Sequence, residues 1–440
     1  PKQAPPPRIA VAVLPFLNLS PDLESAYFCD GLTEELVYVL SKNPALRVVA
    51  RASSFQFKGS AQDVRIIGRK LGAQYLVDGT VRRSGGEVRV TVGLVSVSDG
   101  CQIWAERYDR GIAGILEVQD EIAHAIATAL SATVATGAPT APARHPAKDL
   151  AAYDLYLKGR FFWNQRTEEG FERAVHCYEQ VILRDAEFAR AYAGLAETYV
   201  LMMMHNLEAP AALMPKARTA ALAALSIDPE LASARSSLAA VRMLFDRDPQ
   251  GAETEWQRAL RIDPEYATAW HWYAIFCLSP QGRTQEALEA IQQAERLDPF
   301  SIPIANDVGF VLYFARHYEE AVEQCRKTLS LNPHFYRAIY LTGLALAGEA
   351  RYAEAVEHGL KARALMPGKA FLSQVLAALG SGYANLGQRE AAVATLEELR
   401  KLPFGSPVDL AVVQAALGAR DEAFASLRAA VEQRRGWVVF

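Results

Sequence analysis

The chain has few cysteines, and they form no recognisable motif. Cys29, Cys101, Cys177, Cys277 and Cys325 are scattered over 440 residues, and no two of them are spaced as Cys-x-x-Cys. Zinc-binding and dithiol redox motifs are therefore excluded, and an odd number of cysteines argues against a disulfide framework. We interpret these thiols as small buried hydrophobic groups.

Clustered positive charge and long apolar runs are also missing. The formal net charge is −4, and Lys and Arg form no long basic run. Because binding to phosphates needs clustered cations, we expect no nucleic-acid binding by this segment. No apolar run reaches the ~18 residues of a membrane-spanning helix, so we expect no membrane span within the chain.

The short motifs of catalysis and cofactor binding are absent too. The sequence contains no His-Glu-x-x-His, no Gly-x-Ser-x-Gly, and no Gly-x-Gly-x-x-Gly between a strand and a helix. Ser84-Gly85-Gly86 lacks the Lys and the following helix of a phosphate loop. Met202-Met203-Met204-His205 offers soft donors, but consecutive side chains point around a helix, which favours an apolar helix end or a partner contact over a copper site. We expect no enzyme activity, no cofactor and no metal site.

The sequence does contain a dipeptide that recurs at nearly constant spacing. Prolines follow one another at intervals of 35, 35, 34 and 34 residues in Asp228-Pro229, Asp263-Pro264, Asp298-Pro299, Asn332-Pro333 and Met366-Pro367. A helix-stopping proline at one phase of such a period indicates stacked helical hairpins.

Each interval between these prolines holds two helical stretches separated by a short turn. Small residues such as Gly309, Gly343 and Gly359 stand where two helix backbones would approach closely. Four intervals in register resemble the tetratricopeptide repeat family. The pattern extends over 151–440 and makes about eight hairpins, which we expect to wind into a right-handed all-α superhelix.

The chain before the repeats follows another pattern, in which Val- and Ile-rich runs alternate with amphipathic stretches. We expect strands at 8–17, 46–50, 75–82, 87–97 and 103–108, and helices at 31–40, 64–71 and 116–131, with Asp30 as the N-cap of the first helix. The order βαβαβββα predicts an α/β domain with a mixed sheet. Strand alternation sends Arg82 and Arg83 to opposite faces.

Composition suggests where the domains end. Residues 1–8 form a Pro-rich linker, which we interpret as the remainder after an upstream part was removed. The α/β domain occupies 9–131, a linker rich in Ala, Thr and Pro occupies 132–150, and the repeats occupy 151–440. We expect the domain and the repeats to move as units about the second linker.

Several strings of the α/β domain resemble a known family as a set. They are IAVAVLPFLNLS from Ile9, FCDGLTEEL from Phe28, VDGTVRRSGGEVRVTVGLV from Val77 and IWAERYDR from Ile103. Together they resemble the TolB-like amino-terminal domain that precedes tetratricopeptide repeats in many bacterial signalling proteins, and AYDLYLKGRFFWNQRT from Ala152 resembles the entry into those repeats. The resemblance implies an upstream output module, such as a winged-helix DNA-binding domain, a class III nucleotide cyclase or a protein kinase, often with a membrane helix between.

The candidate binding surface is the wall formed by the first helix of each pair. A mixture of aromatic, amide and charged groups suits an extended peptide or a helix. The alternative is a solvated surface with no defined partner, and the Lys and Asn set that clamps a terminal carboxylate in some family members is not evident. The register of the prolines places these residues on the wall: Arg190, Glu197, His271, Asn306, Phe310, Arg337 and Tyr340.

These observations favour a non-catalytic sensor and protein-interaction segment of a bacterial signalling or transcriptional regulator. Its partner would be a protein, a peptide or a second copy of the chain. The alternative is that the α/β domain binds a small molecule or an envelope fragment and the repeats relay the signal. A membrane helix before Pro1 would place the segment in the periplasm or another extracytoplasmic space, and its absence would place it in the cytoplasm.

Overall fold

The computed structural model describes residues 8–20, 26–84, 87–111, 115–134, 149–366, 368, 371–402 and 406–434. These residues group into two compact units. Unit 1 comprises Pro1–Gln165, Arg173–Phe188 and Leu297–Phe300, and unit 2 comprises Arg166–Glu172, Ala189–Arg296 and Ser301–Phe440. Most of the expected linkers, and residues 85 and 86 between two of the expected strands, lie outside the described residues.

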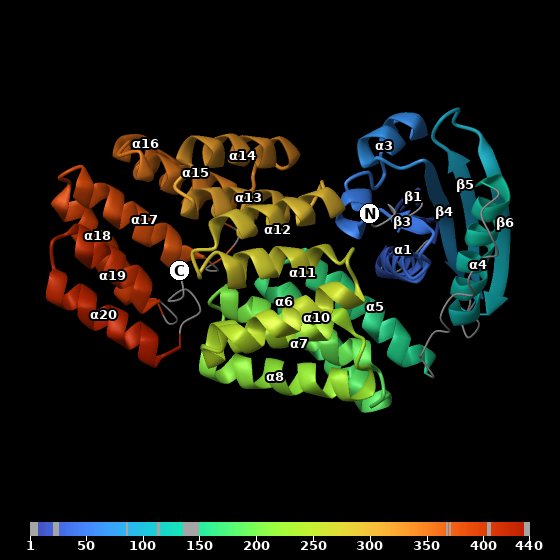
Figure 1. Ribbon diagram of the computed structural model, residues 1–440, viewed down its shortest axis with the longest axis horizontal. Coiled ribbons are helices and arrows are strands. Elements are labelled where there is room, and N and C mark those ends of the chain that lie inside the picture. Colours follow the sequence, from blue (N-terminus) through green and yellow to red (C-terminus); the bar gives the residue numbers. More distant parts are fainter. Residues whose placement is uncertain are drawn as a thin grey trace, which may run out of the picture. The chain divides into compact units, whose positions relative to one another are not determined.

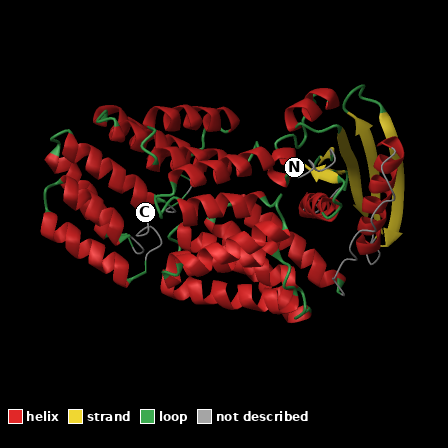
Figure 2. Cartoon of the chain, viewed as in Figure 1, coloured by secondary structure: helices red, strands yellow, loops and turns green. Residues whose placement is uncertain are grey.

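Unit 1 contains a mixed sheet (Figures 1 and 2). Its strands are β1 (Ile9–Val13), β2 (Leu17–Asn18), β3 (Leu46–Val48), β4 (Tyr75–Ser84), β5 (Glu87–Ser96) and β6 (Gln102–Gly111). They are ordered β3-β1-β4-β5-β6, and β2 pairs with β4. Strand β1 is parallel to β3 and β4, whereas β4, β5 and β6 are antiparallel neighbours. The expected mixed sheet is therefore present.

The burial of each strand follows from its sequence. All five residues of β1 are buried, which fits its continuous apolar run between two parallel neighbours. In β5, Val88, Val90 and Val92 are buried, whereas Glu87 and Arg89 are exposed on the other face. Helix α4 (Ile115–Val134) packs against β5 and β6. The apolar face of the antiparallel strands is thus covered by one helix.

The order of elements differs from the expected βαβαβββα by two short elements. Strand β2 is an addition that depends on pairing with β4, because Leu17 lies opposite Thr80. The other addition is α2 (Arg51–Phe55), one turn of helix directly after β3. Neither has the length or periodicity by which a sequence pattern reveals an element. Helix α3 (Val64–Leu71) has the predicted bounds.

Helix α1 (Ala26–Ser41) corrects the expected role of Asp30. The sequence pattern predicted a helix beginning after Asp30, with that residue as its N-cap, but Asp30 lies inside the helix and is buried. Its carboxylate accepts hydrogen bonds from Lys58 Nζ at 2.6 and 2.7 Å. The carboxylate of Asp30 therefore pairs with the ammonium group of Lys58, whereas an N-cap carboxylate would accept hydrogen bonds from backbone amides. A partner 28 residues away is not visible in the local pattern.

Unit 1 also includes α5 (Leu150–Gln165) and most of α6 (Glu168–Arg184). Helix α5 packs against α1. The approach is close because Gly31 has no side chain, and a Cβ added there would lie 2.8 Å from Leu157 Cβ. On the other side of α5, Gly159 faces the ring of Tyr178. Small residues thus let α5 approach helices on both sides.

All described elements of unit 2 are helices (Figure 2). Helices α9 and α11 continue directly into the π-helical segments η3 (Arg242–Asp246) and η4 (Tyr273–Leu278). The helices of unit 2 are α7 (Ala189–Met204), α8 (Pro210–Ile227), α9 (Ala232–Val241), α10 (Pro249–Ile262), α11 (Ala267–Trp272), α12 (Thr284–Leu297), α13 (Ile302–Phe314), α14 (Tyr318–Leu331), α15 (Tyr336–Gly348), α16 (Tyr352–Leu365), α17 (Leu372–Asn385), α18 (Arg389–Arg400), α19 (Pro407–Ala416) and α20 (Arg420–Glu432).

The recurring dipeptides end helices in a common way. Asp228, Asp263 and Asn332 are the C-caps of α8, α10 and α14. The side-chain oxygen of each accepts a hydrogen bond from the backbone amide two residues later, at 3.0, 3.2 and 3.0 Å. This turn needs Asp or Asn, and the proline that follows cannot continue the helix. The period in the sequence is therefore a period of helix ends.

Glycines at helix crossings have the expected role. In α15, a Cβ added to Gly343 would lie 3.0 Å from the Ala355 carbonyl oxygen of α16. Helices α15 and α16 pack closely, as do α7 with α8 and α17 with α18.

Within the described ranges, no helix is both long and apolar enough to cross a membrane.

Candidate functional site

The predicted wall residues all lie on first helices of pairs in unit 2. Arg190 and Glu197 are on α7, His271 is on α11, Asn306 and Phe310 are on α13, and Arg337 and Tyr340 are on α15. Only Arg190 and Arg337 are partly exposed, whereas the other five are buried. The wall is therefore mostly closed by contacts among its own side chains.

Three of these predicted residues converge on Asp307, which the sequence analysis did not identify. His271 Nε2 lies 2.8 Å from Asp307 Oδ2. Asn306 Nδ2 donates to Asp307 Oδ1 at 2.7 Å, and Arg337 Nη2 donates to the same oxygen at 3.4 Å. We call these four residues the Asp307 network. It joins the first helices of three successive pairs, α11, α13 and α15.

The network holds a buried charge next to an opposite charge. Burial alone raises the pKa of Asp307, but Arg337 and His271 outweigh it and lower the pKa below its ordinary value. The carboxylate is therefore ionised at neutral pH, and it balances the guanidinium of Arg337. Asn306 Oδ1 and Arg337 Nε are buried and have no hydrogen-bond partner among the described residues. The network thus contains one buried acceptor and one buried donor that the described residues leave unsatisfied.

An aromatic site adjoins the network at Arg337. The guanidinium carbon of Arg337 lies 4.7 Å from the centre of the Phe371 ring. The ring of His205 meets Phe371 edge to face, with centres 5.7 Å apart, and meets Phe171 in the same way at 5.3 Å. We call Phe171, His205 and Arg337 the aromatic site, and Phe371 is its occupant. Phe171 is on α6, His205 directly follows α7, Arg337 is on α15, and Phe371 directly precedes α17.

His205 is neutral in this site. Burial, followed by the nearby charges of Arg337 and Arg166, lowers the pKa of His205 to about 3. The ring therefore acts as an aromatic contact at neutral pH rather than as a cation. Met203 and Met204, which precede it on α7, are buried. This agrees with an apolar helix end at this stretch.

The other predicted wall residues form separate contacts. Tyr266 donates its hydroxyl hydrogen to Glu197 Oε1 at 2.7 Å. Phe310 stacks on Phe314, with ring centres 6.2 Å apart. Tyr340 is buried, and burial followed by the charge of Asp409 raises its pKa well above the ordinary value. The structure brings none of these three into the Asp307 network.

Asp307 and Phe371 are the residues that sequence reasoning missed. A signal existed for Asp307, because it is the only charged residue in the largely apolar segment Ile302–Phe314. A carboxylate in such a segment is buried only with a partner, and its partners lie on other helices. Phe371 gave no signal, since it follows the last Pro of the repeat pattern in a connection whose path the period does not predict.

A second polar cluster lies in unit 1 at the contact of α1 with α5. Glu34 Oε2 pairs with Arg51 Nε at 2.8 Å, and Glu34 Oε1 pairs with Arg160 Nε at 2.6 Å. Burial raises the pKa of Glu34, but Arg160 and Arg51 outweigh it and lower the pKa below its ordinary value. One turn from this carboxylate, Gly31 meets Leu157. The cluster therefore fastens α5 to α1.

Tyr27 and Asp154 extend this contact. The Tyr27 hydroxyl donates to Asp154 Oδ1 at 2.9 Å, and Arg83 Nη1 donates to the Tyr27 oxygen at 3.3 Å. The strings FCDGLTEEL and AYDLYLKGRFFWNQRT thus supply the facing residues of one interface. Arg83 points to the α1 side of β4, whereas Arg82 is exposed on the other face, as predicted. This cluster has a structural role, because its charges are paired with one another.

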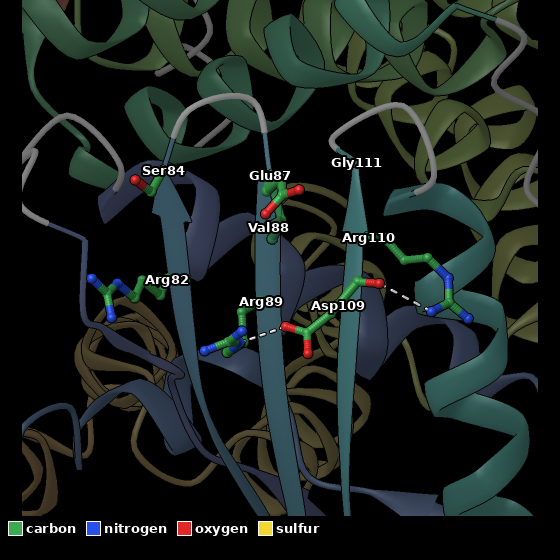
Figure 3. Close-up of a pocket in the computed structure, with 8 residues that line it drawn as sticks. All are labelled: Arg82, Ser84, Glu87, Val88, Arg89, Asp109, Arg110 and Gly111. Carbon is green, nitrogen blue, oxygen red and sulfur yellow. Dashed lines mark hydrogen bonds and ion pairs between the residues drawn. The ribbon is translucent and has the colours of Figure 1, made fainter.

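A shallow cavity of about 410 Å³ lies at the end of the antiparallel strands in unit 1. Figure 3 shows Arg82 on β4, Arg89 on β5 and Asp109 on β6 beside one another. Arg82 and Arg89 are directly opposite across the strands, and Arg89 Nε donates to Asp109 Oδ1 at 2.5 Å. Ser84, Glu87, Val88, Arg110 and Gly111 complete the lining. Among the described residues, no group of three or more His, Cys, Asp or Glu side chains is placed to hold a metal ion.

Comparison with known proteins identifies the repeats. The tetratricopeptide repeat family model matches residues 238–302 and 311–370. A protein of Rhizobium meliloti (strain 1021) that is named as an adenylate cyclase is 37% identical over 196 residues. That alignment covers 44% of this chain and 33% of the relative, so the chain spans about a third of the relative's length.

Solved structures share the helical fold. A monomeric mutant of IFIT1 with m7Gppp-AAAA is 14% identical and has a TM-score of 0.50, with 72% of this chain and 77% of that chain covered. PilF of Pseudomonas aeruginosa is 22% identical and has a TM-score of 0.36, with 51% of this chain and 98% of that chain covered. The match of the family model over residues 238–302 and 311–370 shows that the chain carries tetratricopeptide repeats, whose helical solenoid is an architecture of protein-interaction scaffolds.

Proposed function

We propose that this chain is the non-catalytic sensing and interaction segment of a bacterial signalling or transcriptional regulator, and that it binds a partner protein or peptide through the first-helix wall of unit 2. The repeats form eight helical pairs in this proposal, from α5 with α6 to α19 with α20. The amino-terminal domain is TolB-like, and an output module lies upstream. The resemblance of its strings, and the relative named as an adenylate cyclase, support this organisation.

The observation that supports binding at the wall is the Asp307 network. It places a charged pair, an amide and a histidine on three successive first helices, and it leaves Asn306 Oδ1 and Arg337 Nε without partners among the described residues. A backbone segment of a partner could supply both missing partners, because each peptide unit has one donor and one acceptor. The partner would then contact the wall at Arg337 and Arg190, the two predicted wall residues that are partly exposed.

Selection of peptides tests this proposal. A random peptide library would be selected against the purified chain, and one selected peptide would be measured by isothermal titration calorimetry. We expect Arg337→Ala to weaken binding at least ~10-fold, as for a buried arginine at the centre of an interface. Arg326→Ala is the matched control, because Arg326 is exposed on α14, a second helix. It should change the dissociation constant less than ~2-fold.

A folding control is needed because Arg337 neutralises Asp307. Arg337→Lys keeps the positive charge but loses the planar donor set, so it should fold and still weaken binding. Circular dichroism would confirm the helix content of each variant. If every selected peptide binds the wild type, Arg337→Ala and Arg326→Ala equally, or if the library yields no binder, the wall is not the binding surface.

The cavity in unit 1 favours a second candidate function, in which the domain binds a small anion. Arg82 stands directly opposite Arg89, and like charges in that position repel, although Asp109 pairs with Arg89. An anionic group beside Arg82 would balance the remaining positive charge. Native mass spectrometry of the purified chain tests the idea, since a retained anionic ligand that Arg82→Ala releases would support it. A chain that carries no ligand and binds no phosphate or carboxylate would exclude it.

A further inference from the structure

Phe371 sits in a place where a connecting residue is not expected. It precedes α17, in the connection from α16, yet only 3% of its surface is exposed. Connecting segments usually run over the surface, because their polar backbone groups need water. Here an aromatic ring from a connection is buried against His205, which directly follows α7, and against Arg337 of α15. The ring occupies the aromatic site defined above.

The backbone of Phe371 is unfavourable for this type of residue. Its φ is 66° and its ψ is −1°, which lies in the left-handed region. That region is uncommon for a residue with a bulky side chain, and residues in it persist only where the surroundings hold them. The contacts of the ring with Arg337 and His205 therefore hold this backbone conformation. A competing ring that made the same contacts would let the backbone of Phe371 relax.

The residues around the ring specify what such a competitor must look like. Arg337 lies over the ring face, and a guanidinium prefers the negative face of an aromatic ring to an aliphatic group. His205 presents the edge-to-face geometry that aromatic pairs prefer. An aromatic side chain fits this site better than an aliphatic one of the same size.

Polar atoms of Arg337 and of Gln374 also lack partners among the described residues. Arg337 Nε is a buried donor with no partner among the described residues. Gln374 follows Phe371 by three residues and lies in the first turn of α17, and both of its polar side-chain atoms are buried without a partner among the described residues. Buried polar groups normally have a hydrogen-bond partner. An acceptor next to the aromatic ring of a partner would satisfy Arg337 Nε, and a carboxylate oxygen is the strongest such acceptor for a guanidinium N–H.

We propose that the aromatic site of Phe171, His205 and Arg337 receives an aromatic side chain flanked by acidic residues from a partner protein, and that Phe371 is the chain's own occupant of this site, which the partner displaces. The proposal rests on the proposed function, since it names the chemistry of the partner that binds the wall. Phe371 then weakens binding, because the partner binds only the fraction of chains in which Phe371 has left the site.

The experiment compares two synthetic peptides on three proteins. The probe is acetyl-Gly-Asp-Phe-Asp-Gly-amide, and the control peptide has Leu in place of Phe. Wild type, Phe371→Gly and Phe371→Leu would be titrated with each peptide by isothermal titration calorimetry. Glycine adopts a positive φ without strain, so Phe371→Gly removes the ring and keeps the backbone conformation. Phe371→Leu keeps an apolar side chain and provides a second variant in case the glycine variant does not fold.

We expect Phe371→Gly to bind the Phe peptide at least ~10-fold more tightly than the wild type does, because a site filled nine-tenths of the time loses that factor in affinity. The same substitution should also tighten binding of the Leu peptide, but the logarithm of that gain in affinity should be less than half of the logarithm for the Phe peptide. Phe371→Leu should show an intermediate gain for the Phe peptide. Adding Arg337→Lys to Phe371→Gly should abolish the preference for Phe over Leu, since the lysine cannot lie flat over the ring.

Two results would overturn the inference in distinguishable ways. If the folded Phe371→Gly and Phe371→Leu variants bind the Phe peptide no more tightly than the wild type, Phe371 is a structural residue and not an occupant that a ligand replaces. If the gain is equal for the Phe and Leu peptides, the site accepts any apolar group. Library peptides that bind the wall and depend on Arg337 would leave the proposed function standing in both cases, whereas a failure of that selection would remove the proposed function itself.

Discussion

His205 should make the stability of unit 2 depend on pH in mildly acidic solution. Its pKa is about 3 in the folded chain, against 6.5 for an ordinary histidine. Between these values the unfolded chain binds a proton that the folded chain does not bind, so stability falls as the pH falls below 6.5. Each pH unit contributes about 1.4 kcal/mol, which gives about 2 kcal/mol between pH 6.5 and pH 5.

The variant His205→Phe isolates this effect. Phenylalanine keeps the ring contacts with Phe171 and Phe371 but cannot be protonated. We expect its free energy of unfolding, measured with urea at pH 5, 6.5 and 8, to vary less with pH than that of the wild type. His334→Gln is the control, because His334 is exposed and its removal should leave the pH dependence unchanged. Identical pH profiles for the wild type and His205→Phe would mean that the pKa of His205 is the same in the folded and the unfolded chain.

In unit 1, Glu34 is the residue whose shifted pKa should make stability depend on pH. Two arginines, Arg51 and Arg160, share its carboxylate, and about 14% of its side chain is exposed. Glu34→Gln removes the carboxylate that both cations share, and breaking such a buried pair should cost about 3 kcal/mol at pH 7. The exposed pair of Glu121 with Arg110 provides the control, since Glu121→Gln should change stability by less than ~1 kcal/mol.

The sign of the pH dependence follows from the lowered pKa of Glu34. Its stabilising effect is present above the pKa of an unfolded glutamate, about 4.3, and is lost as the pH falls through the lower folded value. The difference between the wild type and Glu34→Gln should therefore shrink below pH ~4. Urea unfolding at pH 7, 5 and 3.5 measures it, and a difference that stays constant would show that the ion pairs contribute little.

At the scale of the element, local chemistry decided what the sequence could predict. The bounds of α3 were predicted correctly because Asp63 caps its start and Gly72, with φ of 61°, ends it, and both signals are local. The repeats were recognised because their prolines keep one phase, and at Asp228, Asp263 and Asn332 the preceding side chain closes the pair through a bond to the amide two residues later. The bounds of α1 and the role of Asp30 were missed because the partner, Lys58, is distant in the sequence.

The same distinction applies to the candidate site. The register of the prolines placed His271, Asn306 and Arg337 on successive first helices, and the structure brings them together. The register of the prolines could not reveal Asp307 as the shared partner of these three residues, because the direction of its side chain depends on the rotation of α13 about its axis. Phe371 was beyond reach for another reason. Its burial depends on contacts with residues more than 150 positions earlier, and no local pattern encodes them.

Gly343 gives a prediction about how closely two helices pack. Gly343→Ala should favour the helical state of α15 by up to ~1 kcal/mol, but the added Cβ would lie 3.0 Å from the Ala355 carbonyl oxygen. Because a backbone atom cannot move aside, the helices must separate, which typically costs about 1–3 kcal/mol. We therefore expect a net loss of stability in urea unfolding. Gly368→Ala, with open space around the added Cβ, should be nearly neutral, and a stabilised Gly343→Ala would show that the pair can separate freely.

At the scale of the whole molecule, the described contacts extend unit 1 beyond the sheet. Helix α5 belongs to the same unit, although the predicted domain boundary at 132–150 lies before it. The contact includes an ion pair between Glu34 and Arg160, and a hydrogen bond from the Tyr153 hydroxyl to Gln119 Oε1 at 2.7 Å. Gln119 is fully buried, so loss of Tyr153 would leave its amide unpaired. The boundary at 132–150 stays a prediction, and two fragments can test it.

The fragment 8–134 ends with α4, and the fragment 8–188 adds α5 and α6. We expect hydrogen exchange of α1, followed by mass spectrometry, to be at least ~10-fold slower in 8–188, because α5 covers Glu34 and packs Leu157 against Gly31. Leu157→Asp in the longer fragment keeps the chain length but disrupts that packing, so its α1 should exchange as in 8–134. Equal exchange in the two fragments would show instead that α5 contributes nothing to the sheet domain. The domain would then end at the predicted linker, and the strings FCDGLTEEL and AYDLYLKGRFFWNQRT would have separate roles.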